Sequence, residues 1–492
     1  MFSNREINRI KLKLNLIKKL DVKVPKLVFS PTQQEEDISP ILGIRRYGPY
    51  DSNASVDALK RDFKGAEIFA FCPKGDDRVF SSLSRLLEFL DNGYGRKSDY
   101  DTNFGGFRDE FKLEILNIPT PDEIITYEVG RLSEVLSEYK EAFNEASERG
   151  NRPIAIIGGL SHRSTSARRE QYVEAKREFT LIDVPSQYAS YYELEESGYG
   201  ILYQILRDKP VGYPMWNFAL NLYGKIGGIA WIVQQSLYDT IKKIMDLSIG
   251  IRFGRLRGQR GYVFGQATVL DRFGRLVGTI GRAYKFSGMV VPTRIMRDFI
   301  IQAIQKALND PRVKDIYNRD KKKYLNIAFH RLNYFHPQEV LGIQEGLDYI
   351  LKKMNLEKIN YSLIFLISKR TFVVFDEVAE FNNPKYGLSF SINENTAIIH
   401  TAGARSDKDK GPLKYPIVAS CQNLGEKNSV LQNLEGLCSH ILDVSALHWQ
   451  TVIPSSVRLP ATLEFARRIA NFAAYNIQPS QGSLLEKTLW FV

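Results

Sequence analysis

The sequence predicts an α/β protein in which a doubly wound, Rossmann-like domain is followed by an RNase H-like domain. The first prediction rests on an alternation of strands and helices. Apolar residues 152–158 end in glycine, as in a buried parallel strand. A helix at 172–179, a short strand at 181–185 and a helix at 217–223 are expected to follow. This order is typical of a doubly wound sheet, where ligands bind beyond the carboxyl ends of the strands.

The second prediction rests on a change of pattern after Asp246, where three strand-like segments are separated by tight turns. They lead into alternating helices and strands, which is the order of an RNase H-like fold. Strands are expected at 247–253, 261–270, 276–285, 324–329 and 361–367, and helices at 292–308 and 337–354. Later strands are expected near 396–400 and 415–420, and later helices near 431–442 and 460–475.

The pattern divides the chain into three segments. Residues 1–150 mix short elements and include helical patterns at 79–92 and 125–149. We expect residues 1–150 to form a lead-in and the first part of the first domain. Residues 151–240 would form the core of that domain, and residues 241–492 the second domain.

Composition indicates a globular protein with a polyanionic partner. The 492 residues carry a formal net charge of +11, which favours nucleic acid. Residues 251–285 hold eight basic residues and one acid, although a solvated face of a β-meander would have the same composition. No apolar run reaches the roughly 18–20 residues of a membrane span, and no secretory signal is recognisable. Three widely spaced cysteines indicate neither disulfides nor a zinc site, so we expect a cytoplasmic protein.

Four residues of the first domain have the chemistry of a phosphate pocket. Tyr172 and Lys176 are spaced i, i+4 on the expected helix, Gln187 follows, and Lys225 precedes two glycines. Two ammonium groups can neutralise a terminal phosphate, which carries nearly two charges. A tyrosine ring can stack on a base, and an amide can hydrogen-bond a phosphate oxygen or a cation. The alternative is that Tyr172 and Lys176 are only neighbours on a surface helix.

This order of residues resembles the pocket that holds the 5′ end of the guide strand in the MID domain of Argonaute proteins. The resemblance implies that Tyr172, Lys176, Gln187 and Lys225 bind a guide 5′ phosphate. Many members of the family have another lysine where this chain has Asn221, and residues 188–213 contain an insertion. In several prokaryotic members the terminal carboxylate helps to bind a divalent metal. By resemblance, Gln187 and the carboxylate of Val492 would hold Mg²⁺ against the phosphate.

Residues 241–492 resemble the PIWI domain, whose active members hold two metal ions with acidic residues and sometimes a histidine. Three of those positions correspond here to Arg252, Leu332 and Arg467, and the mobile glutamate has no assigned counterpart. Arginine repels magnesium and leucine offers no ligand atom, so we expect no cleavage. A larger set of residues is expected to contact the backbones of guide and target, with solvated charges or internal salt bridges as the alternative. These residues are Arg163, Arg168, Arg169, Asn221, Arg252, Arg255 and Arg467.

Taken together, the resemblance is to a short, catalytically inactive prokaryotic Argonaute that lacks the N and PAZ domains. It implies a short 5′-phosphorylated RNA guide that captures a complementary DNA target from an invader. The effector would be a separately encoded protein, either of the APAZ type or membrane-associated, which triggers abortive infection. Two alternatives stay open: an active endonuclease whose metal ligands are misaligned here, and a scaffold protein without a guide.

Overall fold

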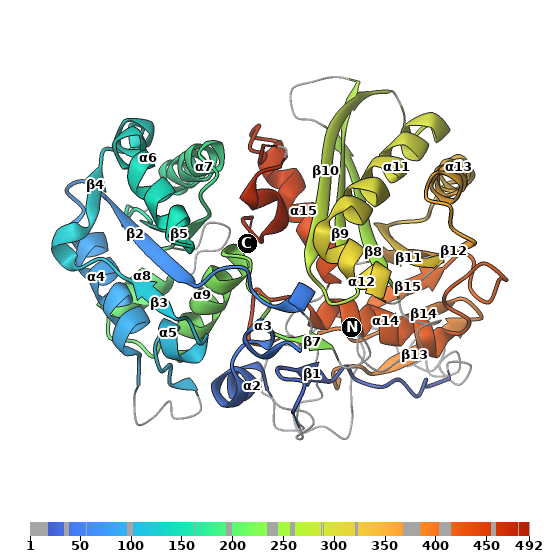
Figure 1. Ribbon diagram of the computed structural model, residues 1–492, viewed down its shortest axis with the longest axis horizontal. Coiled ribbons are helices and arrows are strands. Elements are labelled where there is room, and N and C mark those ends of the chain that lie inside the picture. The colour runs from blue at the N-terminus through green and yellow to red at the C-terminus, as the bar shows by residue number, and fades with distance from the viewer. Residues whose placement is uncertain are drawn as a thin grey trace, which may run out of the picture. The chain divides into compact units, whose positions relative to one another are not determined.

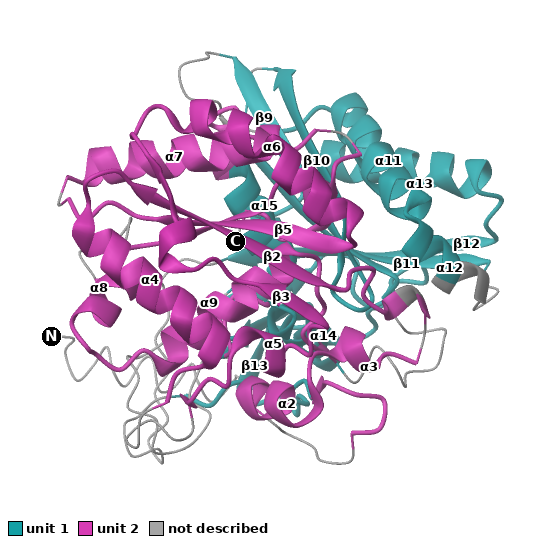
Figure 2. Ribbon diagram, turned by 60° about the vertical axis from the view of Figure 1, so that its left-hand side comes forward, with its two compact units in different colours: residues 1–26, 233–448, 453–470 teal, residues 27–232, 449–452, 471–492 magenta. Residues whose placement is uncertain are grey.

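The computed structural model places the chain in two compact units, which are described separately (Figures 1 and 2). The first comprises residues 1–26, 233–448 and 453–470, and the second comprises residues 27–232, 449–452 and 471–492. The residues described are 18–33, 39–55, 57–95, 102–162, 164–192, 199–233, 245–255, 261–286, 288, 290–319, 323–367, 384–402, 415–453, 459–480 and 482–491.

The second unit is built on a parallel sheet in the order β3–β2–β5–β6, with β4 also paired to β2. Its strands are β2 (Gly65–Pro73), β3 (Ile115–Asn117), β4 (Ile125–Tyr127), β5 (Asn151–Gly158) and β6 (Ser186–Ala189). The chain runs from β2 to β3 and β4 on one side and then to β5 on the other. The sheet therefore reverses its winding between β2 and β5, which is the arrangement of a doubly wound fold.

Helices cover both faces of this sheet (Figure 1). Helices α6 (Leu132–Glu148) and α7 (Thr165–Leu181) enclose one core, which contains Phe71, Phe143, Ile157 and Phe179. Helix α4 (Asp77–Asn92) buries Leu83, Leu86 and Leu90 on the other side. The other described α-helices and strands that begin in this unit are β1 (Leu27–Val28), α2 (Pro40–Tyr47), α3 (Tyr50–Asn53), α5 (Phe107–Glu110), α8 (Ile201–Leu206), α9 (Gly212–Lys225) and β7 (Ile232–Val233).

The first unit is built on an eight-stranded mixed sheet in the order β10–β9–β8–β11–β12–β15–β14–β13. Strands β8, β9 and β10 form an antiparallel meander, and β11 pairs in parallel with both β8 and β12. The strands are β8 (Leu247–Arg255), β9 (Tyr262–Asp271), β10 (Leu276–Lys285), β11 (Tyr324–Leu332), β12 (Lys358–Ile367), β13 (Ser389–Asn393), β14 (Thr396–Ile399) and β15 (Ile417–Cys421).

Each face of this sheet has its own hydrophobic core. Helices α11 (Thr293–Asn309), α12 (Pro311–Arg319) and α13 (Pro337–Lys353) lie over one face. Helices α14 (Leu434–Ala446) and α15 (Ala461–Ala473) contribute to the core of the other. Helix α15 comes very close to β8, because a Cβ added to Gly250 would lie 2.3 Å from the carbonyl oxygen of Thr462. A glycine at this position therefore allows the helix to pack directly on the strand.

The predicted fold class is confirmed, and most of the predicted elements lie within a few residues of their expected bounds. Two predictions were wrong. The expected helix over 125–149 begins only at Leu132, and its first residues form strand β4. The strand expected at 181–185 is instead the end of α7 and a turn with Asp183 at φ 58°, and β6 begins at Ser186. Apolar residues around this turn pack against α7, so their sequence resembles that of a short buried strand.

The two compact units group the chain as follows. Residues 27–232 form one unit, and the late segments 449–452 and 471–492 return to it. No helix in the described ranges is both long enough and apolar enough to span a bilayer.

Candidate functional site

Two buried lysines meet in the second unit. Lys176 on α7 and Lys225 at the end of α9 are 3% and 0% exposed. Both ammonium groups donate to the carbonyl oxygen of Trp490, at 3.0 and 3.2 Å, and Lys176 also donates to the carbonyl oxygen of Ser186 at 2.6 Å. The structure therefore brings together two of the residues predicted from the sequence, and it concentrates positive charge at one point inside the unit.

The local structure explains why these lysines converge. The Ser164 hydroxyl caps α7, and Lys176 lies near the end of this helix, where its ammonium group reaches the first residue of β6. Helix α9 ends at Lys225, and the Gly227 that follows has a φ of 96°, a left-handed conformation that favours glycine. Because of this turn, helix α9 ends at Lys225, and the side chain of this last residue is fully buried.

The segment that carries Trp490 is held against the same elements. The backbone N–H groups of Leu484 and Leu485 donate to the Asp183 carboxylate at 2.8 and 3.0 Å. The Leu489 N–H donates to the carbonyl oxygen of Gly224, 3.3 Å away. These contacts fix residues 484–490 beside the turn after α7 and the last turn of α9. Local spacing could not place Trp490, which lies 314 positions after Lys176, and only the resemblance put the end of the chain near this pocket, through the expected role of Val492.

Two amide side chains near the lysines have buried carbonyl oxygens. Oε1 of Gln187 on β6 and Oδ1 of Asn221 on α9 have no hydrogen-bond partner among the residues that the structure describes. A buried acceptor without a partner is costly, so such an oxygen is suited to bind a cation or a donor from a ligand. Gln187 thus fits its predicted role as an oxygen ligand of Mg²⁺. Val492, the other expected ligand, lies outside the described residues.

Tyr172 lies one helical turn before Lys176 and is half-buried. Its ring packs edge-on against Tyr188, with ring centroids 5.2 Å apart, and is tilted against Phe472 at 5.9 Å. The Tyr188 hydroxyl in turn donates to Oε1 of Gln171, at 2.6 Å. Packing on two sides holds the Tyr172 ring in one orientation, as a stacking platform requires.

The arginines near α7 differ in their surroundings. Arg168 is buried, with its guanidinium 5.1 Å from the centre of the Tyr192 ring and 3.1 Å from the Thr165 hydroxyl. Arg169 is exposed. Arg163 and the side chain of Arg255 lie outside the described part of the chain, so their predicted backbone contacts stay predictions.

The first unit holds Arg252, Leu332 and Arg467, the three positions that are expected to replace the metal ligands. Arg252 follows Ile251, which pairs with Arg331 in the parallel ladder of β8 and β11, so Arg252 and Leu332 lie at corresponding positions of adjacent strands. Burial lowers the pKa of Arg252, and the positive charge of Arg467 lowers it further, whereas the negative charge of Glu464 opposes the shift.

Glu464, which sequence reasoning missed, pairs with the arginines of α15. Its carboxylate accepts from Arg467 at 2.5 and 2.9 Å and from Arg468 at 3.0 Å. Burial alone would raise the pKa of Glu464, but the hydrogen bond from Arg467 and the charges of both arginines bring it down to about 2. The i, i+3 and i, i+4 spacing of these residues was a signal that could have identified the pairs.

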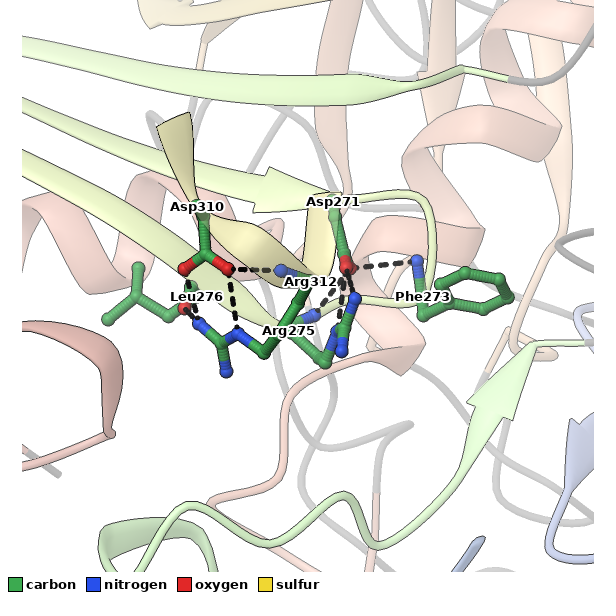
Figure 3. A network of polar contacts seen from close by, with 6 residues as sticks. All are labelled: Asp271, Phe273, Arg275, Leu276, Asp310 and Arg312. Carbon is green, nitrogen blue, oxygen red and sulfur yellow. Dashed lines mark hydrogen bonds and ion pairs between the residues drawn. The ribbon is translucent and has the colours of Figure 1, made fainter. Parts of the chain in front are cut away.

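The basic stretch at 251–285 is partly structural (Figure 3). Arg275 forms a 2.7 Å ion pair with Asp271, and both side chains are 4% exposed. The Asp271 carboxylate also accepts from the N–H groups of Phe273 and Arg275, each at 3.0 Å. Arg275 therefore stabilises the β9–β10 turn, whereas Arg282 on β10 is exposed.

No family model and no curated protein matches the sequence. Among solved structures, the Clostridium butyricum Argonaute bound to a guide DNA and a 19-mer target DNA matches with a TM-score of 0.60, at 18% identity over 96% of this chain and 55% of that chain. The A. aeolicus Argonaute matches with a TM-score of 0.55, at 15% identity over 96% and 55%. Aa-Ago with externally bound siRNA matches with a TM-score of 0.55, at 16% identity over 96% and 56%.

The chain therefore spans about half the length of the solved structures that it matches. Its two sheets and their order along the chain are those of the MID and PIWI domains. In fold, the protein is Argonaute-like.

Proposed function

We propose that this protein binds the 5′ phosphate of a short guide strand and uses the guide to capture a complementary strand without cutting it. The observation that carries the proposal is the convergence of Lys176 and Lys225 on one buried point. Buried ammonium groups attract an anion far more strongly than exposed ones, because little water competes. A terminal phosphate carries nearly two negative charges, which two ammonium groups can balance, and its oxygens can accept hydrogen bonds from both groups.

The side chains around the lysines support the same ligand. The ring of Tyr172, fixed by packing against Tyr188, can stack on the first base of the guide. The amide oxygens of Gln187 and Asn221 can bind a cation or accept from hydroxyl groups. When bound, Mg²⁺ would neutralise part of the phosphate charge. Gln187 would hold it through its amide oxygen, together with the phosphate itself.

The absence of cleavage is the second part of the proposal. Two-metal hydrolysis needs oxygen or nitrogen ligands around both ions. Here Arg252 and Arg467 carry fixed positive charge, and Leu332 has no ligand atom. The ion pair of Glu464 with Arg467 and Arg468 supports this reading, because the carboxylate is already held by two cations. Arg252 is suited to a phosphate of a guide–target duplex, whereas Arg467 already forms the internal ion pair that is the alternative to such a contact.

We further propose that the guide is RNA, that the target is invader DNA, and that a separately encoded effector, of the APAZ type or membrane-associated, responds in the prokaryotic cytoplasm. The structure of Clostridium butyricum Argonaute contains a guide and a target strand, which supports the general scheme of paired strands. Purification with candidate effectors encoded nearby would test the partner.

The first experiment is to purify the protein from cells and to extract its nucleic acid. We expect short 5′-phosphorylated strands from the wild type and none from a Lys176→Ala/Lys225→Ala variant. Empty wild-type protein that also fails to take up a phosphorylated guide in vitro would refute guide binding and favour a scaffold. Incubation of the guide complex with a labelled target and Mg²⁺ or Mn²⁺ tests the second part, since cleavage would establish an active endonuclease.

A further inference from the structure

A second pocket in the same unit lies at the carboxyl ends of β2 and β5. Pro73, which ends β2, and residues 160–162, which follow β5, line this pocket. The sheet reverses its winding between these two strands, so the pocket lies at the position where doubly wound sheets usually bind ligands. None of its lining residues belongs to the site of Lys176 and Lys225.

Four tyrosines form the aromatic part of this pocket. Tyr199 and Tyr203 are stacked, with ring centroids 3.9 Å apart and an interplanar angle of 11°. Tyr192 forms a β-bridge with Tyr199, and its ring lies 6.1 Å from that of Tyr203. Tyr191 packs beneath and is buried. Tyr199 remains 47% exposed, which leaves aromatic surface in contact with solvent at the pocket.

Cationic side chains surround these rings. The guanidinium of Arg207 lies 5.7 Å from the centre of the Tyr203 ring, and the Lys209 ammonium lies 5.0 and 5.3 Å from the Tyr199 and Tyr203 rings. Arg78 and Arg207 both line the pocket. Burial and the neighbouring Tyr192 raise the pKa of Tyr191, whereas the charges of Arg78 and Arg207 oppose this shift, so both guanidinium groups act on one phenol.

Two carboxylates also border the pocket, and one of them already accepts hydrogen bonds from the protein. Asp76 accepts from the N–H groups of Val79 and Ser161 and from the Ser161 hydroxyl, at 3.3, 2.9 and 2.9 Å. These bonds cap α4 and tie it to the loop after β5. The other carboxylate, Asp77, is exposed at the start of α4. Lys74 also lines the pocket but pairs with Glu128, 3.9 Å away, so Arg78 and Arg207 remain beside Asp77.

We propose that this tyrosine pocket binds a nucleotide, with the base on the exposed tyrosine face and the phosphate on Arg78 and Arg207. Aromatic rings bordered by cations are how proteins hold single bases together with their phosphates. The site is separate from the lysine pair and does not depend on guide binding. Its ligand is either a free mononucleotide or one nucleotide of a single strand, because both present the same base and phosphate.

The test uses the full chain carrying Lys176→Ala/Lys225→Ala, so that the other site cannot contribute. Binding of ATP is measured by calorimetry, and binding of a fluorescein-labelled 12-nucleotide strand with a 5′ hydroxyl is measured by anisotropy. We expect at least one probe to bind. Tyr199→Ala should weaken its binding about 5- to 150-fold, the range for loss of one stacked base. Arg207→Ala should weaken it about 10- to 150-fold, the range for loss of a hydrogen bond to a charged group. Tyr199→Phe should keep the affinity.

The matched control is Tyr213→Ala, because Tyr213 is 48% exposed in the same unit but does not line the pocket. Thermal melting of each variant shows that it is folded. Binding of neither probe would overturn the proposal, as would equal binding by the Tyr199→Ala and Tyr213→Ala variants. Preference for ATP over the strand identifies a free nucleotide as the ligand, and the reverse identifies a strand. Guide uptake by the otherwise unaltered protein is measured separately, so each proposal can fail alone.

Discussion

The replacement of Lys225 by methionine tests the lysine pair most directly. Lys225 is fully buried, and its ammonium group is 3.2 Å from the carbonyl oxygen of Trp490. Methionine has a similar length, so the change removes the charge and leaves most of the packing. A hydrogen bond to a charged group contributes about 1.5–3 kcal/mol. The variant should therefore bind a 5′-phosphorylated guide about 10- to 150-fold more weakly.

The assay compares two guides of the same sequence, one with a 5′ phosphate and one with a 5′ hydroxyl. The ratio of their dissociation constants isolates the phosphate, because all other contacts are shared. We expect this ratio to fall in the Lys225→Met variant and to stay unchanged in Lys140→Met, whose lysine is exposed on α6. A folded Lys225→Met variant with the full preference for the phosphate would refute the assignment of this lysine to the pocket.

Three further predictions concern the first unit. Gly250→Ala should destabilise the protein by about 1–3 kcal/mol in urea unfolding, because its Cβ would meet the backbone oxygen of Thr462; unchanged stability would contradict the close packing. Arg275→Met should cost about 3–5 kcal/mol, since it leaves the Asp271 carboxylate buried without its cation, and a loss below 1 kcal/mol would show that the pair is dispensable. Glu464→Gln should lose up to about 3 kcal/mol at pH 7, because the pKa of Glu464 is lowered from 4.5 to about 2. A lowered pKa stabilises the folded state above pH 4.5, so the difference from wild type should shrink as the pH falls toward 2, and a pH-independent difference would exclude the ion pairs as its cause.

The sequence predicted the PIWI-like half more fully than the first 150 residues. Strand β8 alternates apolar residues with small or charged ones, and Gly274, at φ 85°, marks the turn between β9 and β10; both signals are local. The central strand β2 (Gly65–Pro73) was not singled out, because it is apolar on both faces and short runs of this kind resemble segments of a buried helix. Its identity depends on pairing with β5, which lies more than eighty residues later.

The candidate site shows the same limit. Spacing was enough to associate Tyr172 with Lys176, since one helical turn separates them. The contact of both lysines with Trp490 depends on how residues 484–490 cross the ends of α7 and α9, and no local pattern contains this information. The three positions expected to replace metal ligands could be assigned by resemblance because each has its own strand or helix context, and this assignment stays a prediction. Glu464 was missed because its role comes from its ion pairs with Arg467 and Arg468, and it does not occupy one of the motif positions that the resemblance identifies.

The long separation between Lys176 and Trp490 has a consequence for biosynthesis. A ribosome elongates by roughly 5–20 residues per second, so Trp490 is added roughly 15–60 s after Lys176, which it follows by 314 positions. During that interval the parallel sheet and its helices have emerged, while the backbone carbonyl that both lysines contact does not yet exist. The contact of the lysine pair with this carbonyl thus forms only after residues 233–470 have been translated, and a nascent chain cannot present the finished site to a ligand before then.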